Sequence, residues 1–246
     1  MDYASIYPAT FFDNADGRRE WGERKLKYGD ALAAIAYAFG LPSFEALRAV
    51  VAFEGVGRDP VHDGLTAVDQ LSRVRAAATR IPTGALEIGI GRGEVTASLV
   101  HLGCPVQAIE PSPGAVEWLS RTAKNFFDKS IFDDCFAESS ILNGPAHEVL
   151  PLVEWRMIDT VLMVESLEHI LEGDFVPVYD AIRDRLRACG GRFIVTNWID
   201  YHPIQVGWYA SKAIHCRGVD DALYDAWSVD AKRVVYRNGS HLVLDY

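Results

Sequence analysis

The clearest pattern after residue 80 is an alternation of short apolar runs with segments in which apolar residues recur at helical intervals. The apolar runs, which predict buried strands, are residues 85–90, 105–110, 130–136, 157–164 and 192–196. The run at 130–136 is the weakest of them, because it contains two aspartates. Strands that alternate with helices are typical of an α/β fold with a doubly wound, mostly parallel sheet.

The C-terminal segment departs from this alternation and predicts an antiparallel hairpin. Two apolar runs, at residues 233–237 and 241–245, flank Asn238-Gly239, which is a strong signal for a tight β-turn. A helix is predicted just before them, at residues 219–227. Together with the five earlier runs, the hairpin predicts a seven-stranded sheet that ends in an antiparallel pair.

Residues 1–80 have a different pattern, in which helices dominate. Helical periodicity is present at residues 18–39, 43–51 and 66–78, and a loop rich in glycine separates the last two. We therefore expect residues 1–80 to form a helical extension that packs on a core domain at residues 81–246.

Three glycines at alternate positions follow the first predicted strand of the core domain. Gly89, Gly91 and Gly93 predict a turn whose backbone can approach a ligand closely, and a helix follows with its free N–H groups at the turn. The second predicted strand ends in Glu110, which lies 17 residues after Gly93 (110 − 93). That spacing is close to the one at which a carboxylate meets the ribose hydroxyls of a bound nucleoside. The segment is therefore predicted to be a nucleoside-binding βαβ unit.

The glycine spacing and the neighbouring acids indicate which nucleoside. A dinucleotide fingerprint, G-x-G-x-x-G, would have a third glycine where this chain has Glu94. Acidic residues suit a pyrophosphate poorly and are compatible with a cationic ligand. The segment resembles motif I (E/D-x-G-x-G-x-G) of the class I S-adenosylmethionine-dependent methyltransferases, matched at Glu87, Gly89, Gly91 and Gly93.

This resemblance covers roughly residues 81–246 and implies roles for individual residues. The glycine turn would lie beside the methionine part of S-adenosylmethionine, with Glu87 near its amino group, and Glu110 would bind the ribose diol. The stretch 137–140, which contains Glu138, would border the adenine. Glu165, at the end of the fourth predicted strand, is placed among the cofactor contacts as well. In the resembled family, N-terminal helices often cover the substrate, although here they could equally mediate dimerisation.

The fourth predicted strand is followed by two acids and a histidine, in the pattern E-x-x-E-H. If a helical turn begins here, Glu165, Glu168 and His169 share one face and form a credible site for Mg²⁺, Mn²⁺ or another divalent ion. The pattern is similar to that of the small-RNA 3′-terminal 2′-O-methyltransferases and the ubiquinone-pathway O-methyltransferases. In both groups a bound ion favours deprotonation of the acceptor hydroxyl. The RNA group uses a further downstream histidine, for which His202 is the candidate.

Many metal-free methyltransferases carry a similar Glu-His pair that lines the substrate pocket. In that case His169 or His202 would be the catalytic base, since histidine titrates near neutral pH.

Overall charge and composition narrow the substrate class. The net charge is −10 and the isoelectric point is near 5.1, which argues against a surface that binds nucleic acid. No apolar run reaches the roughly 18 residues of a membrane span, and the sequence begins without the pattern of a secretion signal. The four cysteines are widely spaced, without a C-x-x-C pair. We therefore expect a cytoplasmic protein.

The leading hypothesis is a methyltransferase that acts on a small molecule, at an oxygen, with or without a metal. One alternative is a metal-dependent RNA 3′-terminal 2′-O-methyltransferase. Another is a non-catalytic partner subunit that retains the fold. The oligomeric state is left open, with a homodimer as one option.

Overall fold

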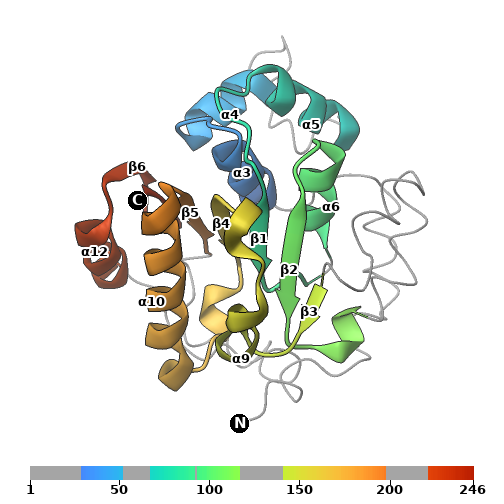
Figure 1. Ribbon diagram of the computed structural model, residues 1–246. Coiled ribbons are helices and arrows are strands. Elements are labelled where there is room, and N and C mark those ends of the chain that lie inside the picture. Colours follow the sequence, from blue (N-terminus) through green and yellow to red (C-terminus); the bar gives the residue numbers. More distant parts are fainter. Residues whose placement is uncertain (1–28, 52–66, 92, 117–140, 198–220) are drawn as a thin grey trace, which may run out of the picture.

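The computed structural model describes residues 29–51, 67–91, 93–116, 141–197 and 221–246 of the chain. Its centre is a seven-stranded sheet in the order β3-β2-β1-β4-β5-β7-β6 (Figure 1). The strands are β1 (Ala85–Ile88), β2 (Val106–Glu110), β3 (Ile141–Asn143), β4 (Thr160–Val164), β5 (Arg192–Thr196), β6 (Arg233–Arg237) and β7 (His241–Asp245). The first five are parallel, and β7 pairs antiparallel with both β5 and β6. The predicted α/β fold with a terminal hairpin is confirmed.

Helices cover both faces of this sheet, because alternate residues of its central strands are apolar on each side. The α-helices are α3 (Gly29–Ala38), α4 (Phe44–Val51), α5 (Ala67–Ala76), α6 (Glu94–His101), α9 (Ala146–Val149), α10 (Glu172–Cys189) and α12 (Asp221–Asp230), and the 3-10 turns are Leu150–Leu152, Trp155–Met157 and Leu167–His169. In β4, Leu162 belongs to the hydrophobic core under α3 and α6, whereas Val161 and Met163 belong to the core under α10 and α12. The central strands β1, β4 and β5 are therefore buried on both faces, as parallel strands usually are.

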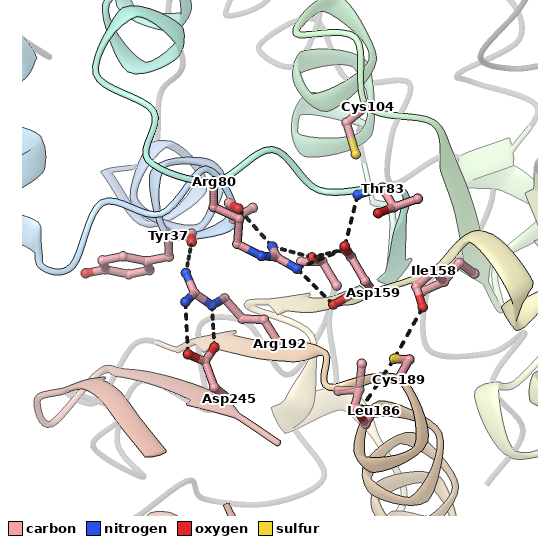
Figure 2. Close-up of polar contacts among 12 residues, drawn as sticks. Tyr37, Arg80, Thr83, Cys104, Ile158, Asp159, Leu186, Cys189, Arg192 and Asp245 are labelled. Carbon is pink, nitrogen blue, oxygen red and sulfur yellow. Dashed lines mark hydrogen bonds and ion pairs between the residues drawn. The ribbon is translucent and has the colours of Figure 1, made fainter. Parts of the chain in front are cut away.

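A cluster of polar contacts anchors the end of α3 to the amino-terminal ends of β4 and β5 (Figure 2). Arg192, the first residue of β5, donates a hydrogen bond of 2.8 Å to the carbonyl oxygen of Tyr37 and also binds the Asp245 carboxylate. Arg80 donates to the carbonyl oxygen of Ala38 at 3.0 Å and to Thr160, the first residue of β4, at 2.7 Å. The last turn of α3 therefore lies at the amino-terminal ends of β4 and β5.

Several predicted elements agree with the structure and one does not. The strands at 192–196, 233–237 and 241–245 have the predicted bounds, whereas the run at 157–164 begins its strand only at Thr160. The strand that pairs with β2 is Ile141–Asn143, so the assignment of residues 130–136 to this place in the sheet is wrong. Residues 130–136 themselves lie outside the described part of the chain. The three residues of β3 sit at the sheet edge and are incompletely buried, so they lack an apolar run that could reveal them.

In the described part of the chain, none of the helices is long and apolar enough to span a membrane.

Cys104 and Cys189 are free thiols, and burial raises the pKa of each.

Candidate active site

The chain reverses its winding direction between β1 and β4, which are neighbours in the sheet although they are not consecutive in sequence. From β1 the chain continues to β2 on one side, and β4 lies on the other. In open α/β sheets, ligands bind at such a switch point, outside the carboxyl ends of the strands. Two segments follow these ends: residues 89–93, called the glycine loop below, and residues 165–169, called the β4 turn.

The glycine loop adopts backbone angles that favour glycine at each of its three glycines. The φ angles are +81° at Gly89, +51° at Gly91 and +76° at Gly93, all in the left-handed region. Among the described residues, a Cβ atom added at Gly91 would have no atom within 4 Å, so this part of the structure leaves open space beside Gly91. Gly93 then caps α6, whose first N–H groups face the same loop. The loop therefore offers backbone and free space where a ligand can lie.

Glu110 connects the end of β2 to the glycine loop. Its side chain is buried, and its carboxylate accepts hydrogen bonds from the backbone N–H of Gly91 at 3.0 Å and of Ser112 at 2.8 Å. The backbone carbonyl of Glu110 accepts a further bond from the side-chain amide of Asn143, at the end of β3. The acid that the sequence singled out is thus in contact with the glycine loop.

Glu87 lies inside β1 rather than on the loop, and its side chain points toward α6. Only 2% of the residue is exposed, and its carboxylate accepts a hydrogen bond from the Thr96 hydroxyl on that helix. Burial raises the pKa of Glu87 to about 8 and that of Glu110 to about 7, although the hydrogen bonds to each carboxylate partly oppose the shift. Two buried carboxylates near one loop favour a positively charged ligand.

The β4 turn contacts the glycine loop through Ser166. The Ser166 hydroxyl donates a hydrogen bond of 2.6 Å to the carbonyl oxygen of Ile88, the last residue of β1. Glu165 has a φ of +47°, and it is the one non-glycine residue with positive φ in the described ranges. Sequence reasoning missed Ser166, because its partner lies on a strand that is distant in sequence.

The predicted metal ligands of the β4 turn do not form a metal centre by themselves. Within the described residues, which include Glu165, Glu168 and His169, no group of three His, Cys, Asp or Glu side chains is placed to hold a metal ion. The prediction assumed an α-helical turn that starts at Glu165, but the turn is a 3-10 helix of Leu167–His169 and Glu165 lies outside it in a left-handed conformation. Three residues per turn do not bring positions i, i+3 and i+4 to one face.

Two further predicted site residues, Glu138 and His202, lie outside the described part of the chain, and their roles stay predictions. Glu138 was placed at the adenine because it would follow the third strand. Since β3 begins at Ile141, Glu138 precedes that strand, and the argument from strand order no longer holds. Asn143 and Gly144 stand at the carboxyl end of β3 instead.

Residues 86–195, which run from β1 through β5, match the sequence profile of a family described as a methyltransferase domain. The chain carries an S-adenosylmethionine-dependent methyltransferase domain. The glycine loop, Glu110 and the β4 turn all lie within the matched residues. No curated protein matches the sequence of this chain.

Several solved structures are similar to this chain. The glycopeptide N-methyltransferase MtfA complexed with (S)-adenosyl-L-methionine is 26% identical, with a TM-score of 0.40, over 62% of this chain and 59% of that chain. The PH0226 protein from Pyrococcus horikoshii OT3 is 15% identical, with a TM-score of 0.46, over 66% of this chain and 81% of that chain. The CcbJ methyltransferase from Streptomyces caelestis is 24% identical, with a TM-score of 0.37, over 51% of this chain and 47% of that chain. The match to MtfA thus spans less than two thirds of that protein.

The residues of the candidate site are compatible with S-adenosylmethionine in the space and the charge that they provide. Gly91 has open space where a side chain would otherwise lie, and the buried Glu110 carboxylate stands next to it. S-adenosylmethionine carries a sulfonium and an ammonium group, which suit buried carboxylates with raised pKa values. In the absence of a nearby cation, burial disfavours the ionised form of these acids.

This electrostatic fit predicts that cofactor affinity depends on pH. A ligand that carries positive charge and donates hydrogen bonds to the Glu110 carboxylate stabilises its ionised form. Binding should therefore be strongest above the pKa of Glu110 in the protein without ligand, about 7, and should weaken as the pH falls through that value. Between pH 7.5 and pH 5.5 we expect the dissociation constant of S-adenosylmethionine to rise roughly 25-fold, the value for one carboxyl that has a pKa of about 7 without ligand and stays ionised in the complex. Calorimetric titration across this range measures the effect. The Glu110→Gln variant should bind more weakly at pH 7.5 and show a flatter profile, and an equal affinity at both ends for the unmodified protein would contradict the prediction.

Proposed function

We propose that this protein transfers the methyl group of S-adenosylmethionine to an oxygen atom of a small-molecule acceptor. The observation that carries the proposal is the contact between the Glu110 carboxylate and the Gly91 amide, beside open space at the switch point of the sheet. When bound, the cofactor supplies a methyl group that is already activated by its attachment to a sulfonium. The protein then mainly aligns the reactants and excludes water.

On the cofactor side, Glu110 binds the ribose hydroxyls, and the glycine loop lies along the methionine part. Glu87 supports the loop from inside β1 through its carboxylate, which is held by Thr96 on α6. Glu165 stands at the start of the β4 turn and completes the cofactor contacts. These roles agree with the order in which β2, β1 and β4 lie across the sheet.

On the acceptor side, His169 is the candidate base that removes the proton from the acceptor hydroxyl. His169 is the last residue of the 3-10 turn after β4 and is half-buried. Its ring can therefore reach a molecule that is bound at the carboxyl end of β4. The proposal assigns deprotonation to His169 rather than to a metal, because its neighbouring acids do not converge with it into a three-ligand group in the described part of the chain. His202 remains the second candidate for this role.

The charge of the protein supports a small acceptor over RNA. With a net charge of −10, the chain provides little overall attraction for a phosphate backbone. The N-terminal extension, residues 1–80, is the candidate cover for the acceptor, as N-terminal helices often are in the resembled family, and dimerisation is its alternative role.

The proposal is tested by calorimetric titration with S-adenosylhomocysteine, the product of the reaction. We expect measurable heat and a micromolar dissociation constant. The Glu110→Ala variant should weaken binding at least tenfold, whereas Glu154→Ala, which removes an exposed carboxylate, should not change it. No heat with the unmodified protein would contradict the proposal. Salt-dependent binding of short RNA would favour the RNA alternative, and cofactor binding without turnover of any acceptor would favour the non-catalytic one.

A further inference from the structure

We propose that Ser166 is a positioning residue that couples the glycine loop to the β4 turn, so that cofactor binding and the acceptor side of the site respond as one unit. The inference rests on the proposed function, because it takes the glycine loop as the cofactor site. Ser166 itself need not touch either reactant. It acts through the backbone of Ile88 and Gly89.

The position of Ser166 in the sheet gives it this role. The β1–β4 pairing runs from Ala85 opposite Thr160 to Glu87 opposite Leu162 and does not extend to Ile88. The two strands therefore separate just before the switch point, where the ligand crevice of such sheets opens. Beyond the last paired residues, the Ser166 hydroxyl bridges the gap with its 2.6 Å hydrogen bond to the carbonyl oxygen of Ile88.

Steric contact reinforces this hydrogen bond. A Cβ atom added at Gly89 would lie 2.5 Å from the Cβ of Ser166, which is closer than real Cβ atoms come to other atoms. Gly89 is therefore required by the β4 turn, whereas the open space at Gly91 serves the ligand. The β4 turn blocks movement of Gly89 toward β4, and the hydrogen bond opposes movement away from it. The first residue of the glycine loop is thus fixed between β1 and β4.

The backbone of the β4 turn is strained in a way that places Ser166 for this contact. Glu165 adopts a left-handed conformation, which costs free energy for a residue with a side chain. Its backbone N–H donates to the carbonyl oxygen of Thr196 on β5 at 2.8 Å, which holds the strained residue in place. The turn is therefore anchored to β5 on one side and to β1 on the other. A change in the acceptor-side turn is transmitted to the glycine loop through Ser166.

The test compares Ser166→Ala with Ser98→Ala. Ser98 is also buried and also donates a 2.6 Å hydrogen bond to a backbone carbonyl, that of Glu94, but this bond lies within α6. We expect Ser166→Ala to weaken S-adenosylhomocysteine binding about tenfold, because the hydrogen bond that fixes the glycine loop is lost. Ser98→Ala should stay within about twofold of the unmodified protein. Both variants are measured by calorimetry and by thermal unfolding.

Hydrogen exchange provides a readout that a general loss of stability does not reproduce. Without ligand, Ser166→Ala should raise the exchange rate of the amides of residues 89–93 about tenfold more than Ser98→Ala does, since local opening of that loop becomes easier. In the unmodified protein, S-adenosylhomocysteine should slow the exchange of residues 166–170, and this protection should be lost in Ser166→Ala.

The outcomes separate the inference from the proposed function. If Ser166→Ala and Ser98→Ala have the same affinity and the same loop exchange, the inference is overturned while the function stands. If the unmodified protein does not bind S-adenosylhomocysteine, the function fails, and the exchange of residues 89–93 without ligand still decides whether Ser166 fixes the loop.

If Ser166→Ala does not fold, Gly89→Ala replaces it, with Gly103→Ala as its control. The two glycines have nearly the same φ, +81° and +82°, but a Cβ atom at Gly103 would meet no atom of the described residues within 4 Å. Loss of affinity in Gly89→Ala alone supports the inference, and equal affinity in the two variants overturns it.

Discussion

Replacing Gly91 by valine is expected to abolish cofactor binding while leaving the domain folded. Gly91 has a φ of +51°, which a β-branched residue adopts only with strain, and its missing side chain leaves the space that the proposal assigns to the cofactor. The valine side chain would fill that space. We expect the dissociation constant of S-adenosylhomocysteine to rise on the order of a hundredfold or more, which corresponds to about 2.7 kcal/mol. Calorimetry measures the effect.

Gly103→Val is the matched control for this variant. Gly103 follows α6 and has a φ of +82°, and in the described part of the chain no atom lies within 4 Å of the position of its Cβ. It therefore suffers a comparable backbone strain at a place that is not part of the candidate site. Thermal unfolding should show a similar loss of stability in the two variants, and affinity should fall in Gly91→Val alone. Unchanged binding in Gly91→Val would mean that the open space beside the loop is not the cofactor site.

Replacing Arg192 by leucine is expected to cause the largest loss of stability. Its guanidinium is almost fully buried, binds both carboxylate oxygens of Asp245 at 2.7 and 3.1 Å, and donates to the carbonyl oxygen of Tyr37 (Figure 2). Leucine would leave that carbonyl and much of the carboxylate without a partner at the edge of the sheet. Removing one partner of a buried ion pair typically lowers the free energy of unfolding by about 3–5 kcal/mol. We expect a loss of about 3 kcal/mol in Arg192→Leu, because Arg233 also binds Asp245. Urea denaturation measures this difference.

Arg233→Leu removes the second arginine that binds the Asp245 carboxylate. Comparing it with Arg192→Leu distinguishes the effect of burying an arginine from the effect of its charge alone. The Arg233 side chain is 65% exposed, so its ion pair with Asp245 is screened by water. The expected loss is below about 1 kcal/mol. Burial by itself would raise the pKa of Asp245, and the hydrogen bonds from Arg192 and Arg233 lower it below the usual value. If the two leucine variants lose equal stability, the assigned role of the buried Arg192 is wrong.

Much of the fold follows from local sequence patterns, because the strands of a parallel sheet are buried on both faces and appear as continuous apolar runs. The strands β5, β6 and β7 have clear chain signals at their ends, Gly190-Gly191 before β5 and Asn238-Gly239 in the hairpin, and their predicted bounds are confirmed. β3 has neither feature. It is a short edge strand, so its place in the sheet depends on pairing with β2 rather than on its own composition.

The cofactor half of the candidate site was open to prediction for a related reason. The glycine loop and Glu110 belong to one βαβ unit, whose two strands are adjacent in the sheet and run in the same direction. Local geometry therefore brings the acid to the loop, and the structure places the carboxylate 3.0 Å from the Gly91 nitrogen. The E-x-x-E-H pattern was a poorer guide to side-chain positions, since only an α-helical turn would bring its three side chains to one face. The structure instead has Glu165 in a left-handed conformation, followed by a 3-10 turn.

The sequence by itself determined the order of the described strands and helices except for β3, together with the glycine loop and the acid that closes the second strand, since these depend on residues close together in the chain. Only the tertiary structure decided which strands are neighbours across the switch point, and hence that Ser166 meets Ile88 and that Arg192 holds the end of α3. Those contacts join residues 78 and 155 positions apart. No local pattern encodes such a pairing, because it arises from how the helices and strands pack to bury their apolar faces.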